Sequence, residues 1–148
     1  MVSVHFGSEV LHLEIPDRNI VFNLNPGLFP RPADEASEIR NALRNPVGSP
    51  RLKELAGGKG SIVILGDDRT RLTPQDRILP VVLEELYSAG VRPEQIKIII
   101  ACGTHRPMTG DEIELKFGRQ LMEEIEIRNH DYKDLDNLKI TSINAARF

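Results

Sequence analysis

The sequence has a single cysteine and no tryptophan, and it lacks any long apolar run. A single thiol, Cys102, cannot form an intramolecular disulfide, so nothing indicates an oxidising compartment. The apolar runs are too short to cross a membrane, and residues 1–16 lack the basic start and continuous apolar core of a signal peptide. We therefore predict a cytoplasmic protein that has no membrane partner.

Positive charge is also scarce, because 19 lysines and arginines face 22 aspartates and glutamates, a net charge of −3. A nucleic-acid-binding surface usually needs a basic surplus, so nucleic acid is not an expected partner. The four histidines are scattered and the one thiol stands alone, so no cluster has the spacing of metal ligands. With 40% apolar and 28% charged residues, the 148 residues are typical of a single folded domain, which we expect to span residues 1–148.

The first half of the chain predicts a β-hairpin followed by helices. Polar and apolar residues alternate over residues 2–6 and 9–15, with Gly7 and Ser8 between them as a tight turn. A third strand is expected over residues 19–24. Acidic residues early and Arg44 at the end favour a helix over residues 33–44, and Ser49 with Pro50 suits the start of a second, short helix.

The second half predicts alternating strands and helices. We expect strands over residues 61–66, 96–101 and 125–129, the first covered on both faces, and a further strand over residues 138–143. One helix is expected from Pro74 to Ala89 with Thr73 as its N-cap, and another after Thr109, with Ile113, Phe117 and Leu121 on its buried face. This order predicts an α/β fold with a Rossmann-like, mostly parallel sheet flanked by helices, to which the N-terminal antiparallel hairpin is added.

Two similar loops follow two of the predicted strands. The stretch "ILGDDRTRLTP" (64–74) places four charges where a strand gives way to a helix, and "IIIACGTHRPMTG" (98–110) repeats this plan. Ligands of open parallel sheets bind beyond the carboxyl ends of the strands, and helix starts there favour anions. Arg71 offers a planar cation for a carboxylate or phosphate, and the His105 imidazole can exchange a proton near neutral pH.

The other residues of these loops allow more than one interpretation. Asp68 can orient Arg71 or accept a hydrogen bond from a ligand hydroxyl, and Gly103 can let the backbone approach a ligand closely. An exposed ion pair and an incidental histidine would explain the same residues without any site. Cys102 is expected to be a small buried residue at a strand end, and His130 to belong to a turn. The residues alone leave the choice between a site and a plain surface open.

Four segments in order resemble the N-terminal domain of the nickel-dependent lactate racemase family. They are "ALRNPVGSPRLKELA", "SIVILGDDRTRLTP", "IIIACGTHRPMTGDEI" and "NHD", which cover roughly residues 20–135. The combination of "DDRTR" with "GTHRPMT" is the specific signal. Leu72 departs from the family, which usually has proline after the arginine.

The resemblance implies a racemase that moves a hydride between the α-carbon of a 2-hydroxy acid and a nickel pincer nucleotide tethered to a lysine. It assigns His105 as one of two histidines that handle the hydroxyl proton, and it places Asp68 and Arg71 in the cofactor and substrate site. The remaining residues of the matching motifs are expected to bind cofactor or substrate: Thr70, Gly103, Thr104 and Arg106.

The same resemblance implies that this chain is an N-terminal fragment of a longer, two-domain enzyme. The second histidine, the cofactor lysine and the nickel ligand lie further on in family members, so the missing C-terminal portion is an expected partner. The fragment alone is expected to be inactive and to hold no nickel or cofactor. Two rivals remain: a non-catalytic α/β module that binds a small anion at the same loops, and an enzyme that uses His105 as a base on another α-substituted acid.

Overall fold

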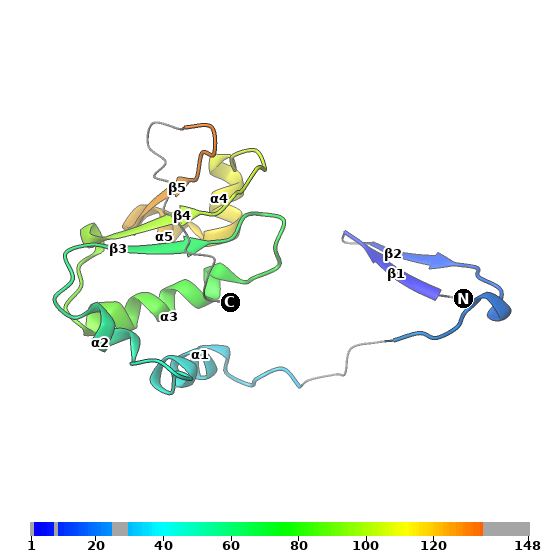
Figure 1. Ribbon diagram of the computed structural model, residues 1–148, viewed down its shortest axis with the longest axis horizontal. Helices are drawn as coiled ribbons and strands as arrows, with labels where there is room; N and C mark the ends of the chain where they lie inside the picture. Colours follow the sequence, from blue (N-terminus) through cyan, green and yellow to red (C-terminus); the bar gives the residue numbers. More distant parts are fainter. Residues whose placement is uncertain (1, 8, 25–29, 135–148) are drawn as a thin grey trace, which may run out of the picture. The chain divides into compact units, whose positions relative to one another are not determined.

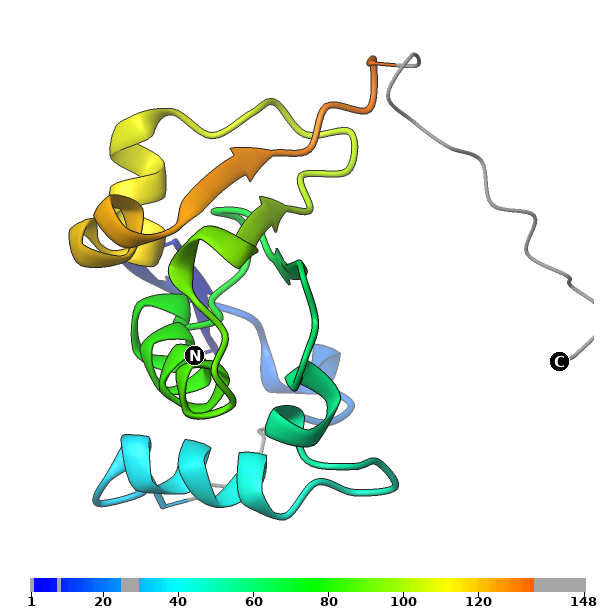
Figure 2. The same ribbon diagram turned by 90° about the vertical axis from the view of Figure 1, so that its left-hand side faces the viewer.

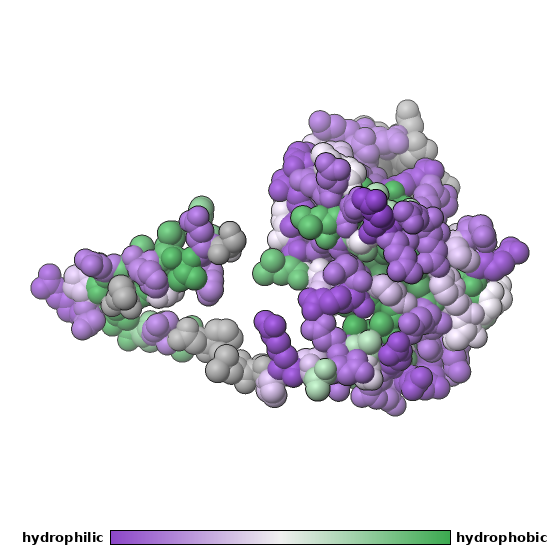
Figure 3. Space-filling model, turned by 180° about the vertical axis from the view of Figure 1, so that it is seen from behind, coloured by the Kyte–Doolittle hydropathy of each residue, from purple (hydrophilic) through white to green (hydrophobic). Residues whose placement is uncertain are grey.

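The computed structural model describes residues 2–7, 9–24 and 30–134, and the chain divides into two compact units, Met1–Arg31 and Pro32–Phe148. The first unit holds an antiparallel hairpin of β1 (Val2–Phe6) and β2 (Glu9–Leu13), as the alternating pattern predicts (Figure 1). Much of its apolar surface is exposed (Figure 3, green), and Phe6 is among its exposed side chains. The strand predicted over residues 138–143 lies outside the described residues.

The third strand expected over residues 19–24 is wrong. A 3-10 turn, η1 (Asp17–Asn19), follows Pro16, and the Ile20 amide donates to the Asp17 carbonyl oxygen at 3.0 Å. Residues 20–24 are irregular, and the Phe22 side chain is largely exposed. The apolar content of this stretch suggested a strand, but the turn takes up backbone groups that strand pairing would have needed.

The second unit holds a three-stranded parallel sheet in the order β3 (Ile62–Gly66), β4 (Ile96–Ile100) and β5 (Glu126–Asn129). Ile62 pairs with Ile96, and β5 continues the ladder on the other side of β4 (Figure 1). The carboxyl ends of all three strands therefore lie at one edge of the sheet. This arrangement confirms the predicted α/β class with its parallel sheet.

Helices connect the strands and cover one face of the sheet. The chain crosses from β3 to β4 through α3 and from β4 to β5 through α4 and α5. Because the strand order runs in one direction, two crossovers of the same hand place their helices on the same face (Figure 2). Within the described residues, no helix has the length and apolar character needed to cross a bilayer. The helical segments of this unit are α1 (Glu35–Arg44), α2 (Leu52–Ala56), α3 (Gln75–Ser88), η2 (Pro93–Gln95), α4 (Gly110–Phe117) and α5 (Arg119–Glu124).

The core lies between these helices and one face of the sheet. Ile98 of β4 is fully buried in the same cluster as Leu86 of α3 and Phe117 of α4. On the opposite face, Val63 and Leu65 of β3 are 52% and 74% exposed. The expectation that residues 61–66 are covered on both faces is therefore wrong, since within the described residues β3 is an edge strand of its sheet and the helices cover the other face.

The helix starts follow the sequence signals only in part. Thr109 caps α4 as predicted, because its hydroxyl accepts from the Glu112 amide while the Glu112 carboxylate accepts from the Thr109 amide. Thr73 does not cap α3, which begins after Pro74. The short helix α2 likewise begins after Arg51 rather than at Ser49 and Pro50.

The helix predicted from Thr109 through Leu121 is divided by Gly118. This glycine has φ +86°, a conformation that ends α4 and starts α5 at a new angle. The predicted apolar face survives the break, because Ile113, Phe117 and Leu121 are all buried. Phe117 packs so closely on the end of β3 that a Cβ on Gly66 would lie 3.0 Å from its ring.

Candidate functional site

A hollow of ≈ 260 Å³ lies where β3 and β4 end side by side. Asp67, Asp68 and Arg71 line it from the loop after β3, and residues 101–105 line it from the loop after β4. The expectation that the two loops meet at one edge of the sheet, with Arg71 and His105 around a shared space, is confirmed. The chemical roles of these residues remain predictions.

Asp68 joins the two loops through His105. Its Oδ2 lies 2.5 Å from Nδ1 of the imidazole, and its Oδ1 accepts from the Thr70 amide at 3.0 Å and the Thr70 hydroxyl at 2.6 Å. The Asp68 residue is only 4% exposed, whereas 55% of the His105 side chain is exposed. The aspartate is therefore a buried anchor for an imidazole that faces solvent.

Hydrogen bonds keep the Asp68 carboxyl ionised. Two contacts lower the pKa of Asp68 from 3.8 to about 2: the hydrogen bond from the Thr70 side chain, which has the larger effect, and the contact with His105. An ionised carboxylate only accepts hydrogen bonds, so we assign the shared proton to His105 Nδ1. In the neutral ring this leaves Nε2 as the basic atom, free to take a proton from a ligand.

This arrangement predicts a pH-dependent contribution of Asp68 to stability. Because the pKa of Asp68 is lower in the folded protein than in the unfolded chain, the stabilisation is complete above about pH 4 and is lost as the pH falls towards about 2. Urea unfolding of wild type and Asp68→Asn should give a free-energy difference that shrinks between about pH 5 and about pH 2. A difference that stays constant over that range would contradict the assignment of Asp68 as an ionised anchor.

Arg71 brings an unpartnered cation to the hollow. Its amide donates to the Asp68 carbonyl oxygen at 3.2 Å, which fixes the turn, but its guanidinium makes no hydrogen bond or ion pair with the described part of the chain. Of the two interpretations of Asp68, an orienting contact with Arg71 is not seen, since the Asp68 carboxylate contacts Thr70 and His105. A free guanidinium beside a hollow can bind a carboxylate or phosphate of a ligand.

The remaining predicted site residues are divided between the hollow and its surroundings. Gly103 and Thr104 line it, and Gly103 has φ +57°, a backbone conformation that favours glycine. Thr70 does not line the hollow, but its amide and hydroxyl donate hydrogen bonds to Asp68, which does. Arg106 is instead paired with Glu112, with Nη2–Oε1 at 2.7 Å, and lines an adjacent hollow on the other side of the loop.

Three residues hold the first loop in place and were not assigned this role from the sequence: Asp67, Gln75 and Lys116. Lys116 of α4 donates to the carbonyl oxygens of Arg71 and Thr73, at 2.6 and 3.0 Å, and pairs with Asp67. Although partial burial raises the pKa of Asp67, donation from Thr73 and Lys116 outweighs it and lowers the pKa below the usual value. Gln75 donates to the Asp67 carbonyl oxygen at 2.9 Å. No local signal marks Lys116, because its partners lie more than forty residues away.

Asn129 holds the second loop and was also missed, although a signal was present. It is the last residue of β5, a polar residue at the carboxyl end of a predicted strand, and it hydrogen-bonds to both ends of the loop that carries His105. His130 follows it and donates its amide to the Ile100 carbonyl oxygen at 3.0 Å. Cys102 is 2% exposed at the end of β4, as expected.

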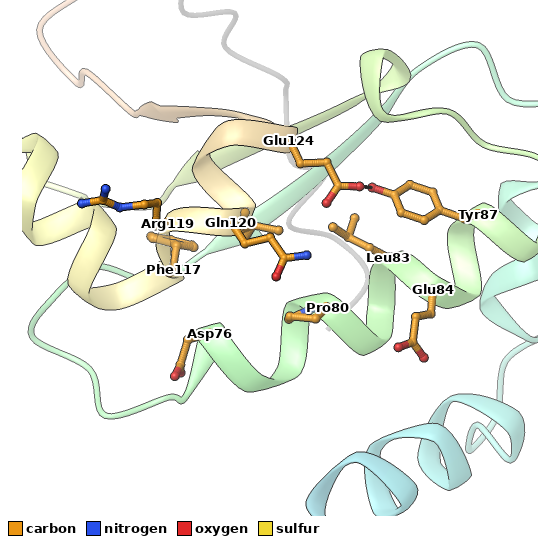
Figure 4. A pocket seen from close by; sticks show the side chains of 11 residues that line it. Asp76, Pro80, Leu83, Glu84, Tyr87, Phe117, Arg119, Gln120 and Glu124 are labelled. Carbon is orange, nitrogen blue, oxygen red and sulfur yellow. Dashed lines mark hydrogen bonds between the residues drawn. The ribbon is translucent and has the colours of Figure 1, made fainter.

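A larger hollow, of ≈ 430 Å³, lies between α3 and the α4–α5 segment, away from the strand ends (Figure 4). Leu83 and Phe117 contribute apolar surface, while Asp76, Glu84 and Glu124 contribute carboxylates. Its cation, Arg119, is already paired with Glu114, and the Tyr87 hydroxyl donates to Glu124. These charges would repel an anionic ligand, so the hollow at the strand ends is the better candidate for an anion.

A metal centre within this part of the chain is not supported. Among residues 2–7, 9–24 and 30–134, no group of three or more His, Cys, Asp or Glu side chains is arranged to hold a metal ion. Asp68 and His105 form a pair, and the Cys102 thiol is turned to Asn129. His105 offers a group for proton transfer, and Arg71 offers a group for anion binding.

Comparison with known proteins finds similarity to lactate racemases. The lactate racemase N-terminal domain family matches residues 6–144. Lactate racemase of Thermoanaerobacterium thermosaccharolyticum is 33% identical over 141 residues, covering 94% of this chain and 33% of that protein. Lactate racemase of Lactiplantibacillus plantarum is 33% identical over 132 residues, covering 87% and 31%.

A solved structure gives the same result. The lactate racemase apoprotein of T. thermosaccharolyticum matches with a TM-score of 0.73 and 33% identity, over 92% of this chain and 31% of that one. The chain thus spans about one third of the length of these relatives. From the match over nearly its whole length, the chain belongs to the lactate racemase N-terminal domain family.

Proposed function

We propose that the full-length protein interconverts the enantiomers of a 2-hydroxy acid, and that this chain supplies one wall of the active site. The observation that carries the proposal is the Asp68–His105 pair beside the free guanidinium of Arg71 in one hollow. Membership of the family, together with relatives named lactate racemase, supports the reaction class. The longer, two-domain architecture and the cytoplasmic location remain part of the proposal.

The residues suit the two polar groups of a 2-hydroxy acid. Arg71 binds the carboxylate, and His105 Nε2 accepts the hydroxyl proton while Asp68 holds the opposite ring nitrogen. Removal of that proton, together with the α-hydrogen and its electron pair, leaves a 2-oxo acid. Return of both to the opposite face gives the other enantiomer, and for that step a second acid/base must stand across the substrate.

The hollow also fits the anionic groups of a nucleotide-type cofactor. With Arg71 occupied by the substrate, the backbone around Gly103 and Thr104 can approach a carboxylate or phosphate of such a group closely. When bound, the nickel pincer nucleotide implied by the resemblance would accept the hydride and give it back. No described residues form a nickel site, so we assign the nickel ligands to the further part of the enzyme.

Removing the Arg71 guanidinium is expected to weaken substrate binding. A hydrogen bond to a charged group contributes about 1.5–3 kcal/mol, so Arg71→Ala should raise KM for either lactate enantiomer by roughly 10–100-fold. The measurement is chiral analysis of lactate incubated with the full-length holoenzyme. Arg77→Ala is the matched control, because Arg77 is an exposed arginine of α3 paired with Glu35.

The outcome of this experiment separates the proposal from the anion-binding module. Wild type should bring either enantiomer to an equal mixture. A holoenzyme that binds lactate through Arg71 but never changes its configuration would support the module and remove the racemase proposal. An Arg71→Ala enzyme with wild-type KM would remove Arg71 from substrate binding.

A further inference from the structure

A single side chain outside both loops fixes the two ends of the loop that carries His105. Asn129 Nδ2 donates to the Met108 carbonyl oxygen at 3.0 Å, and Asn129 Oδ1 accepts from the Met108 amide at 2.9 Å. The same oxygen accepts from the Cys102 thiol at 3.3 Å. One amide group therefore joins the first residue of the loop, the last residue before the Thr109 cap, and the end of β5.

Between these two ends, the loop is also held by Arg106, which pairs with Glu112 of α4 at 2.7 Å. Within it, the His105 amide donates to the Cys102 carbonyl oxygen at 3.0 Å and closes one turn. His105 also contacts Asp68, so its ring is held from β3 while its backbone depends on the loop. By joining Cys102 to Met108, Asn129 limits where the backbone of the loop between them, including His105, can lie.

Asn129 does not itself line the hollow formed by Asp68, Arg71 and His105. It cannot contact a ligand there, and it has no acid/base chemistry of its own. Its side-chain amide donates one hydrogen bond, to the Met108 carbonyl oxygen, and accepts two, from the Met108 amide and the Cys102 thiol. We refer to these three hydrogen bonds of Asn129, to Cys102 and to both backbone groups of Met108, as the clamp.

We propose that Asn129 is a positioning residue that holds the 102–108 loop so that His105 meets both Asp68 and the substrate hydroxyl. This inference rests on the proposed function for the role of His105. It assigns catalytic importance to the end of β5, a strand that supplies no residue to the hollow.

The test is Asn129→Ala in the full-length holoenzyme, read by kinetics and by a chemical probe. A displacement of about 1 Å can cost ~10²-fold, so we expect kcat to fall by ~10–10²-fold. KM should change by less than about threefold, because Arg71 belongs to the other loop. Asn45→Ala is the matched control, since Asn45 donates two side-chain hydrogen bonds to Asn41 on α1, away from the hollow.

Cys102 reports on the clamp independently of activity. The thiol is 2% exposed, so iodoacetamide should modify it slowly in wild type and in Asn45→Ala, as followed by mass spectrometry of its peptide. In Asn129→Ala the loop end is released, and we expect modification to be at least ~10-fold faster. If the variant does not fold, hydrogen exchange of the Met108 amide in wild type replaces it, and protection is expected.

The outcomes distinguish the two proposals. Unchanged kcat together with unchanged Cys102 reactivity in Asn129→Ala, or an unprotected Met108 amide in wild type, would overturn the clamp. Faster Cys102 modification with an unchanged kcat would overturn its role in positioning His105. If wild type lacked racemase activity, the proposed function would fail, while the thiol and exchange measurements would still decide whether the clamp exists.

Discussion

Replacing His105 with alanine in the full-length enzyme is expected to lower turnover of both lactate enantiomers by roughly 10²–10⁴-fold. His105 is the histidine that lines the hollow. Its Nδ1 contacts Asp68, and its Nε2 has no hydrogen bond to the described part of the chain. Loss of proton transfer on one face slows both directions, because every conversion passes through both faces. The measurement is the initial rate of enantiomer conversion from each side.

The control for this variant is His12→Ala. His12 is an exposed histidine of the β1–β2 hairpin that hydrogen-bonds to Ser3 through Nδ1, so it too is a histidine with one ring nitrogen engaged. Its loss should leave turnover within about twofold of wild type. A His105→Ala enzyme that performs as well as this control would exclude His105 from the mechanism.

Asp68→Asn is expected to lower kcat by roughly 10²-fold or more, although the substituted side chain has nearly the same shape. An amide can present an N–H to the imidazole, which would favour the tautomer with the proton on Nε2. The atom that should accept the substrate proton would then already carry one. Because polar bonds to Thr70 can partly survive, we expect the variant to fold despite its lower stability, so that its kcat can be measured.

The protonation of the two ring nitrogens of His105 can be measured independently of activity, and it tests whether Asp68 sets the tautomer. Nitrogen-15 spectra of His105 should show Nδ1 protonated in the neutral ring of wild type and a shift towards Nε2 protonation in Asp68→Asn. Asp76→Asn is the matched control, since Asp76 is an exposed aspartate in the first turn of α3. Equal kcat and an unchanged tautomer in Asp68→Asn would show that Asp68 does not orient His105.

The sequence was sufficient to predict the elements that depend on local patterns. Apolar strands followed by amphipathic helices predicted the parallel sheet, and Thr109 with Glu112 predicted the start of α4. The two charged loops were located at the correct edge because parallel strands end together. These features follow from periodicity and capping, which the sequence expresses within a few residues.

The errors came from competition between local and tertiary interactions. Thr73 has the side chain of an N-cap, but its hydroxyl donates to Asp67 at 2.5 Å, and α3 starts after Pro74 instead. The apolar run of β3 suggested burial on both faces, yet nothing local reveals that the crossover helices lie on one side. Capping propensity and hydrophobicity describe what a residue can do, and the fold decides which partner it meets.

The contacts that shape the hollow could not be predicted for the same reason. Asp68 and His105 are separated by 37 residues, and Lys116 reaches 45 residues back to the Arg71 carbonyl oxygen. From the sequence, Arg71 or a ligand hydroxyl could be the partner of Asp68, and nothing in the sequence gave the distance to His105 on the neighbouring strand end. The resemblance singled out the two loops that line the hollow, and the structure shows which of their side chains are paired.

The most direct test of the account follows the α-hydrogen of the substrate. The full-length holoenzyme is incubated in ordinary water with lactate carrying deuterium at the α-carbon, and the deuterium content of the opposite enantiomer is measured by mass spectrometry. If His105 handles the hydroxyl proton while the α-hydrogen moves as a hydride, the product should keep its deuterium. Loss of deuterium to water in step with enantiomer conversion would show that a base removes the α-hydrogen as a proton, and would contradict the role proposed here for His105.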